Sequence, residues 1–258
     1  MGERVLSIEN ATIGYSCGKK PVAVAANINA SLCSGELAAL IGRNGSGKST
    51  LLRTISAQQK PLAGNVLLEN RPVTELSAGE AAKLISVVLS NANVAPLSVQ
   101  ELVSLGRVPH TNFLGHMTTG DKAAVEEAMR QMGVTALAER MLPTISDGER
   151  QKCMIAKALA QDTPLILLDE PTAFLDYPSK VALFRLLKEL AAQKGKAIIL
   201  STHDIELAFA LAGKIWLVDG GRLHEGTPAE LAGNGALQSF IDCDTLHYNT
   251  ILHRIEII

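Results

Sequence analysis

The chain has few aromatic residues, only 3% of its 258 residues, and no strong excess of either charge. Its formal net charge of −2 gives no bias toward polyanions, so nucleic acid is not expected as a partner. Its cysteines, Cys17, Cys33, Cys153 and Cys243, are far apart and include no C-x-x-C pair. This spacing indicates reduced, mostly buried thiols and argues against a disulfide framework or a cysteine metal cage.

Long apolar segments are also missing. The sequence has no run of about 18 or more apolar residues, and its start, M-G-E-R-V-L-S-I-E-N, has no basic region followed by an apolar core. We therefore expect neither a spanning helix nor a secretory signal, and a protein that stays in the cytoplasm, where it can dock on a membrane protein. The absence of an internal repeat excludes a fused tandem of two similar domains.

The most informative segment is G-R-N-G-S-G-K-S-T, residues 42–50. An apolar run at Leu37–Ile41 precedes it and a helical pattern at Leu51–Ala57 follows, so its glycines lie at an expected strand-to-helix junction. Such glycines let successive N–H groups turn inward, and the new helix adds its unpaired N-terminal donors, so the loop is suited to phosphates. Lys48 is suited to reach the β- and γ-phosphates, and the Ser49 hydroxyl to contact a Mg²⁺ ion. The candidate nucleotide-binding residues of the loop are Gly42, Arg43, Asn44, Gly45, Ser46, Gly47, Lys48, Ser49 and Thr50.

Two acidic residues follow a second apolar run. The run at Leu165–Leu168 predicts a buried strand, and Asp169 and Glu170 come at its C-terminal end, the edge where open α/β sheets bind ligands. Asp169 suits the shell of a Mg²⁺ ion, and Glu170 can polarise a water for attack on the γ-phosphate. Apolar strands that end in acids are common, but beside a phosphate loop this one indicates phosphoryl transfer.

Three further sites have an ordinary structural alternative. Tyr15 is either a strand tyrosine packed on the core or a ring on which adenine stacks. His203 follows an expected strand at the edge that also holds the acidic pair, yet lone histidines are often packed or capping side chains. Ser146, Asp147 and Gly148 precede a long helix, and their donors form either a plain helix start or a second anion site.

The overall pattern predicts an α/β protein with a P-loop NTPase core built on a mostly parallel sheet. An N-terminal antiparallel β subdomain precedes the core, with Val5–Ile8 and Ala11–Tyr15 as one antiparallel pair. A helical subdomain at about residues 90–143 is inserted in the core, and it contains an amphipathic helix at Asp121–Gly133 with Asp121 as its cap.

Near the end of the core, Asp204 is expected to cap a short helix, and strands at Lys214–Val218 and Arg222–Glu225 to form a hairpin. Residues 1–240 are then one domain, and the tail at 241–258 has no role that the sequence assigns.

Taken in order, these residues resemble the ATPase subunit of ABC transporters. The matching segments are Tyr15, the loop at 42–50, S-D-G-E at Ser146–Glu149, L-I-L-L-D-E at Leu165–Glu170, F-L-D at Phe174–Asp176, and His203. Six motifs in the right order are far more specific than any one of them, and they cover nearly the whole chain. The resemblance implies ATP and Mg²⁺ as cofactors and a head-to-tail homodimer in which two chains enclose each ATP.

The resemblance also implies a role for each matched residue. Ser146 and the amides of Asp147 and Gly148 would cap the γ-phosphate of the nucleotide bound to the other chain. Tyr15 would stack on adenine, Glu170 would be the general base, and His203 would hold the γ-phosphate. The remaining matched residue, Asp176, would link the two sites.

Two residues depart from the family pattern. A glutamine that usually follows the strand expected at Ile85–Leu89 is replaced by Ser90, with Asn91 beside it, so Ser90 is assigned only a weaker or water-mediated Mg²⁺ contact. The usual glutamine of the S-D-G-E segment is replaced by Glu149, whose charge near the nucleotide is expected to lower affinity.

Within the family, L-S-V-Q-E-L-V-S-L-G-R-V-P-H-T at Leu97–Thr111 is similar to importers of iron-siderophores, haem and cobalamin. This similarity implies integral-membrane permease subunits as partners, an extracytoplasmic binding protein upstream, and a peripheral location on the cytoplasmic face of the cell membrane. The segment identifies a coupling surface and only indirectly a cargo.

Other functions remain open at this stage. A soluble ABC-type ATPase of repair, assembly or translation usually has large insertions or a tandem copy, which this chain lacks. A regulatory module that binds nucleotide without hydrolysing it is disfavoured by the presence of both Glu170 and His203. A GTPase is disfavoured because the chain has no N-K-x-D segment.

Overall fold

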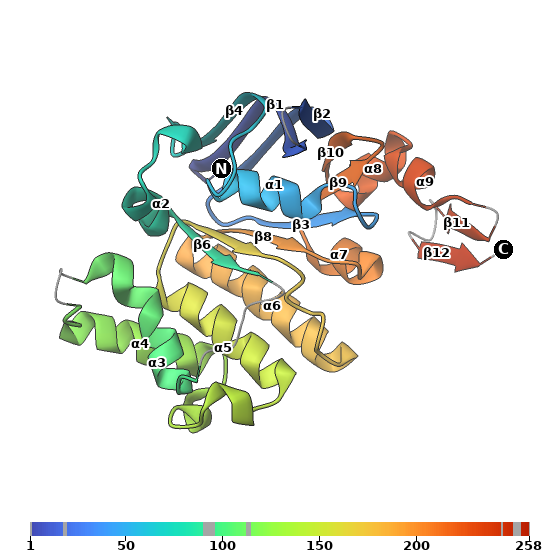
Figure 1. Ribbon diagram of the computed structural model, residues 1–258. Coiled ribbons are helices and arrows are strands. Elements are labelled where there is room, and N and C mark those ends of the chain that lie inside the picture. The colour runs from blue at the N-terminus through green and yellow to red at the C-terminus, as the bar shows by residue number, and fades with distance from the viewer. Residues whose placement is uncertain are drawn as a thin grey trace.

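The computed structural model describes residues 2–17, 20–89, 96–111, 115–243, 245–249 and 254–257. Within these ranges the strands form a six-stranded sheet in the order β10-β9-β3-β8-β7-β6, a four-stranded sheet in the order β2-β1-β4-β5, and the pair β11-β12. Figure 1 shows the four-stranded sheet above helix α1 and the six-stranded sheet below it. The α/β fold predicted from the sequence is confirmed, with a mostly parallel core sheet, an antiparallel N-terminal sheet and a helical insertion.

The six-stranded sheet is built from short apolar runs. Its strands are β3 (Leu37–Gly42), β6 (Ile85–Val88), β7 (Leu165–Leu168), β8 (Ala197–Ser201), β9 (Lys214–Asp219) and β10 (Arg222–Gly226). Every residue of β3, β7 and β8 is buried, because helices or the second sheet cover both faces, as parallel sheets require. All neighbours pair in parallel except β9 and β10, which form the predicted hairpin.

Helices cover the two faces of this sheet. Helix α1 (Lys48–Ile55) lies between the two sheets, where Leu51, Leu52 and Ile55 are buried in a core shared by both. Helices α5 (Asp147–Ala160) and α6 (Tyr177–Lys194) lie on the opposite face (Figure 1). Two smaller helices, α2 (Ala78–Leu84) and α7 (Ile205–Leu211), and the 3₁₀ turn η1 (Val73–Glu75) complete the core.

The N-terminal sheet corrects one prediction. Val5–Ile8 and Ala11–Tyr15 are not a pair but parts of one strand, β1, which pairs with β2 and β4. The two halves are joined at Asn10, which has a φ of 49° and whose N–H donates to Asn29 Oδ1 at 3.0 Å. Asparagine tolerates this left-handed conformation, so the strand bulges there without reversing direction. The strands of this sheet are β1 (Arg4–Cys17), β2 (Lys20–Cys33), β4 (Ala63–Leu68) and β5 (Arg71–Pro72).

The helical insertion lies between β6 and α5 in the chain and at the lower left of Figure 1. It consists of α3 (Val99–Ser104), η2 (Leu105–His110), α4 (Thr119–Gln131), η3 (Thr135–Leu137) and η4 (Leu142–Thr144). The prediction that Asp121 caps α4 was wrong, because Thr118 is the N-cap. Asp121 lies in the first turn and completes a capping box, in which its carboxylate accepts from Thr118 N at 2.9 Å. Hydrogen bonds from Thr118, and then from Arg107, lower the pKa of Asp121 to about 2.

Two smaller expectations also need correction. Asp204 is the residue before α7, but its side chain makes no cap and instead accepts from Lys180 Nζ at 3.0 Å. The thiols are not mostly buried, since Cys33 is half-buried and Cys243 exposed. Cys153 is buried, and desolvation raises the pKa of its thiol to about 11. None of these three cysteines forms a disulfide.

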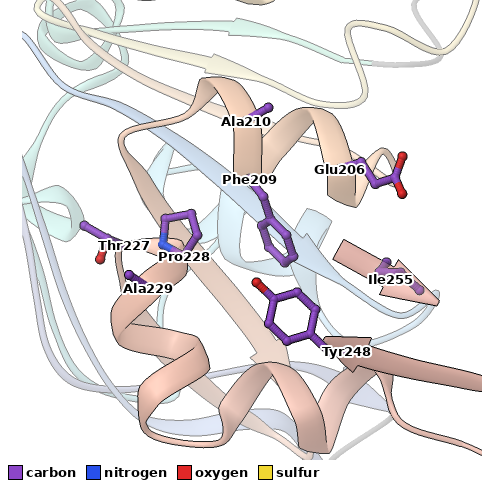
Figure 2. Close-up of a pocket in the computed structure, with 8 residues that line it drawn as sticks. All are labelled: Glu206, Phe209, Ala210, Thr227, Pro228, Ala229, Tyr248 and Ile255. Carbon is purple, nitrogen blue, oxygen red and sulfur yellow. The ribbon is translucent and has the colours of Figure 1, made fainter. Parts of the chain in front are cut away.

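The C-terminal part of the chain folds back onto the core. It contains α8 (Pro228–Gly233), α9 (Ala236–Ile241), β11 (Leu246–Asn249) and β12 (Arg254–Ile257). The ring of Tyr248 on β11 is fully buried and meets Phe209 of α7 edge to face, with 5.9 Å between centroids. Figure 2 shows this pair beside a cavity of about 580 Å³, which Pro228 and Ile255 also line. Among the described residues, no helix combines the length and apolarity needed to cross a bilayer.

Candidate functional site

The phosphate loop joins β3 to α1, as the sequence predicts. Gly47 is the residue before α1 and has a φ of 108°, and a Cβ there would lie 2.7 Å from Val24 Cγ1. A Cβ at Gly42 would lie 2.6 Å from the carbonyl oxygen of Val218 on the neighbouring strand. A larger residue at Gly42 would have to displace backbone, and one at Gly47 would have to displace the Val24 side chain, so the loop is shaped by close packing as well as by conformation.

Lys48 opens α1 and is buried at the mouth of the loop. Its Nζ donates to the carbonyl oxygens of Gly42 at 2.7 Å and Arg43 at 3.2 Å. Burial lowers the pKa of this ammonium, and the nearby charges of Glu170 and Asp169 oppose that shift. Beside it, Ser46 Oγ is buried and has no hydrogen-bond partner in the part of the chain that the structure describes. The desolvated ammonium of Lys48 and the unpaired hydroxyl of Ser46 are groups that a phosphate bound in this loop would satisfy.

The two acids lie at the end of β7, next to the loop. Ser49 Oγ donates to Asp169 Oδ2 at 3.3 Å, so these two oxygens are close enough to contact one cation. Serine and carboxylate oxygens are the hard ligands that Mg²⁺ prefers, and Mg²⁺ usually keeps waters and phosphate oxygens as its other ligands. The described residues contain no group of three or more His, Cys, Asp or Glu side chains that would form an all-protein cage.

Glu170 and His203 meet at the ends of adjacent strands. His203 Nε2 lies 2.6 Å from Glu170 Oε1, and both side chains are partly exposed. Glu170 has a φ of 51°, a left-handed conformation that is costly for a residue with a long side chain. Strained backbone held by its surroundings is typical of functional sites, and here it places the carboxylate beside the histidine.

Ser201 is a site residue that the sequence reasoning missed. It is the last residue of β8, is fully buried, and donates to Asp169 Oδ1 at 2.6 Å while accepting from Glu170 N at 2.8 Å. One hydroxyl therefore fixes both acids. The signal in the sequence was a serine at the end of the apolar run 197–201. Asp169 and Glu170 follow another apolar run and lie at the same edge of the sheet.

Replacement of Ser201 by alanine is expected to lower the free energy of unfolding by about 1–3 kcal/mol, because the partly buried amide of Glu170 and the buried carboxylate of Asp169 lose their partner. Urea unfolding measures this loss, and the exposed Ser239→Ala variant is the control that should change little. An unchanged unfolding midpoint in Ser201→Ala would show that the hydroxyl does not fix the acids.

The remaining predicted residues lie elsewhere. Ser146 is the N-cap of α5, which begins with Asp147 and Gly148 rather than after them. A Cβ at Gly148 would lie 3.3 Å from Leu175, so this helix start packs against the F-L-D segment. Among the described residues, no hydrogen bond or ion pair joins the Ser146–Glu149 segment to the phosphate loop.

Three other positions complete the comparison with the sequence. Tyr15 lies on β1 with 53% of its surface exposed, so the core-packing alternative is wrong and its ring is accessible. Asp176 is the N-cap of α6 and accepts from Ser179 N at 2.9 Å; hydrogen bonds from the side chain and then from the backbone of Ser179 lower the pKa of its carboxyl. Ser90, for which a weaker or water-mediated Mg²⁺ contact is expected, lies outside the described residues.

Comparison with known proteins agrees with this geometry. The ABC transporter family model matches residues 25–173. The ferric enterobactin transport ATP-binding protein of Escherichia coli is 39% identical over 225 residues, which are 86% of this chain and 82% of that protein. The hemin import ATP-binding protein of Streptomyces coelicolor is 39% identical over 211 residues, 81% of this chain and 74% of that protein.

A solved structure shares the fold. The dimeric post-hydrolysis structure of an ATP-binding cassette bound to ADP and Pi superposes with a TM-score of 0.75 at 29% identity, covering 86% of this chain and 98% of that one. The phosphate loop, the acids at the neighbouring strand end and these matches define an ATP-binding cassette. The chain belongs to the ABC transporter family and is an ATP-binding subunit of that family.

Proposed function

We propose that this protein is the ATP-hydrolysing subunit of an importer for iron-siderophore, haem or cobalamin, working as a homodimer on a separate permease. The observation that supports it most is the convergence of Lys48, Asp169, Glu170 and His203 at the ends of β3, β7 and β8. The class of cargo is supported by relatives named for ferric enterobactin and hemin transport. Residues 1–240 form the ATPase domain, with the helical insertion at about 90–143 as the surface for the permease.

In this proposal the loop binds the nucleotide and the acids act on it. Lys48 and Ser46 hold the phosphates, and the exposed ring of Tyr15 stacks on adenine. Glu170 accepts a proton from the attacking water, and His203, 2.6 Å from its carboxylate, orients it and contacts the γ-phosphate. Ser49 and Asp169 would hold a Mg²⁺ ion, which neutralises phosphate charge when bound.

The segment at Ser146 supplies the reason for a dimer. Its first amides, those of Asp147 and Gly148, have no partner within the helix, as is general for the first turn of an α-helix, and are free to bind an anion. In a head-to-tail homodimer they cap the γ-phosphate bound to the other chain, so each site needs two chains. The dimer then works at the cytoplasmic face of the cell membrane as a peripheral subunit, with an extracytoplasmic binding protein delivering cargo to the permease.

The proposal is tested by measuring the ATPase rate of the purified protein with Mg²⁺ against its own concentration. The rate per chain should rise with concentration until dimers dominate, because a single chain holds only part of each site. Analytical ultracentrifugation at the same concentrations reports the mass. A chain that stays monomeric and turns over at a constant rate per chain would overturn the homodimer and favour a soluble ATPase complete in itself.

Glu149 gives a separate prediction. Its carboxylate accepts from Ser146 N at 2.9 Å and Ser146 Oγ at 2.8 Å, and these bonds lower its pKa, so it is ionised at neutral pH where the γ-phosphate of the other chain would approach. Glu149→Gln keeps an acceptor for the cap and removes the charge. It should lower the KM for ATP about fivefold, because a negative charge that would repel the γ-phosphate is removed.

The matched control for this change is Glu230→Gln. Thr227 and Glu230 form the same reciprocal cap at α8 and do not belong to the candidate nucleotide site, so the KM should stay constant there. Steady-state kinetics separate KM from kcat. An unchanged or higher KM in Glu149→Gln would show that the Glu149 charge does not face the nucleotide.

A further inference from the structure

The C-terminal part of the chain contacts the phosphate loop directly. Arg43, the second residue of the loop, donates from Nη2 to the carbonyl oxygen of Phe240 at 3.0 Å. Its guanidinium carbon also lies 5.8 Å from the centroid of the Phe240 ring. These two residues are 197 positions apart in the sequence, so the contact exists only because α9 docks against the core.

The chemistry of this contact suits an arginine. Phe240 lies in the last turn of α9, whose carbonyl groups have no partner within the helix and form the negative end of its dipole. A guanidinium satisfies one of these oxygens and places its face near an aromatic ring at the same time.

Docking of α9 also packs the strand that leads into the loop. Leu237, Phe240 and Ile241 are buried in one core cluster with Ile41, the residue before Gly42. The loop residue that α9 holds is connected in turn to the lysine, because the carbonyl oxygen of Arg43 accepts from Lys48 Nζ at 3.2 Å. A short series of contacts therefore runs from Phe240 through Arg43 to Lys48.

A second contact reaches the other side of the site. Tyr248 of β11 meets Phe209 of α7 edge to face, and α7 begins at Ile205, two residues after His203 (Figure 2). The same folded-back segment thus touches both the loop that holds phosphates and the helix that follows the histidine.

We propose that α9 is a positioning element for the phosphate loop, and that the contacts of Phe240 with Arg43 raise the affinity of the chain for ATP. The proposal rests on the nucleotide-binding role of the loop. It assigns Phe240 as a positioning residue that acts through Arg43 and makes no contact with the nucleotide itself.

The test is a double-mutant cycle of Phe240→Leu and Arg43→Ala, with the Kd for ATP measured by calorimetry in the absence of Mg²⁺. Leucine keeps an apolar side chain and the backbone carbonyl but removes the ring, which should raise the Kd about two- to fivefold. In the Arg43→Ala background, Phe240→Leu should leave the Kd constant, because the guanidinium that the Phe240 ring contacts is no longer present. A Kd unchanged by Phe240→Leu, or raised equally in both backgrounds, would overturn the proposal.

The control for loss of packing is Ile241→Val, which removes a methylene from the same helix end and the same core. It should lower the thermal midpoint without changing the Kd for ATP. A Kd raised as much by Ile241→Val as by Phe240→Leu would assign the effect to stability and overturn the positioning role. Failure of the unmodified protein to bind ATP at all would instead contradict the proposed function.

A measurement on the unmodified protein keeps the test independent of folding. Coupling between two sites is reciprocal, so ATP must stabilise the docked α9 if docked α9 favours ATP. Hydrogen exchange of the amides at residues 237–241 should therefore slow when ATP is added. Exchange at these amides that is the same with and without ATP would overturn the proposal.

Discussion

Replacement of Glu170 by glutamine is expected to abolish ATP turnover while leaving ATP bound and two chains associated. The amide cannot accept the proton of the attacking water, and removal of a general base typically costs about 10²–10⁴-fold in rate. The glutamine keeps the size of the side chain and an oxygen that can face His203 Nε2, which lies 2.6 Å from the carboxylate in the unmodified chain. Single-turnover kinetics measure the rate, and size-exclusion chromatography with ATP measures the dimer.

The matched control for Glu170→Gln is Glu69→Gln. Glu69 is also a glutamate with positive φ, at 46°, but it is exposed just after β4 and does not belong to the candidate site. The same chemical change on the same kind of strained backbone should leave turnover unaltered. A Glu170→Gln variant that hydrolyses ATP near the original rate would exclude Glu170 as the general base.

Replacement of Lys48 by alanine is expected to weaken ATP binding about 10- to 150-fold, since a hydrogen bond to a charged group contributes about 1.5–3 kcal/mol. Calorimetry measures the Kd. The control is Lys214→Ala, which removes a lysine bound to Glu36 at 2.9 Å and Glu225 at 3.2 Å at the start of β9. That variant should lose stability but keep its affinity for ATP. Equal affinities for Lys48→Ala and the unmodified chain would contradict the phosphate-binding assignment.

The lowered pKa of Lys48 adds a pH signature to this variant. Because the folded chain holds this proton less tightly than the unfolded chain does, stability rises with pH over the alkaline range just below the ordinary lysine pKa. Lys48→Ala should lose that part of the rise. Urea unfolding of both proteins across this range measures the difference.

The edge of the sheet that holds the candidate site could be predicted from the sequence because its signals are local. An apolar run, a Gly-rich loop and a helix start identify β3, the loop and α1, and the acids follow β7 directly. The caps were harder, because Thr118 and Asp121 are both good N-cap residues and only the backbone decides which one precedes the helix. Asn10 was misjudged for a similar reason, since a left-handed asparagine is compatible with either a turn or a bulge.

Contacts between distant parts of the chain could not be predicted. Ser201 joins the two acids only because β8 lies between β3 and β7, an order that no local pattern states. The bond from Arg43 to Phe240 depends on how α9 returns to the core, and nothing near either residue indicates it.

The position of β6 has a mechanical consequence. It is the last strand of the six-stranded sheet, with β7 as its neighbour, and the chain runs on from it into the helical insertion. Its final residue, Val88, accepts a hydrogen bond of 2.8 Å from the amide of Asp169. A force on the insertion, directed away from the sheet, would therefore act on an edge strand. It would load the hydrogen bonds between β6 and β7 one after another instead of all together. The first bond to bear that force is the one that ties the strand to Asp169.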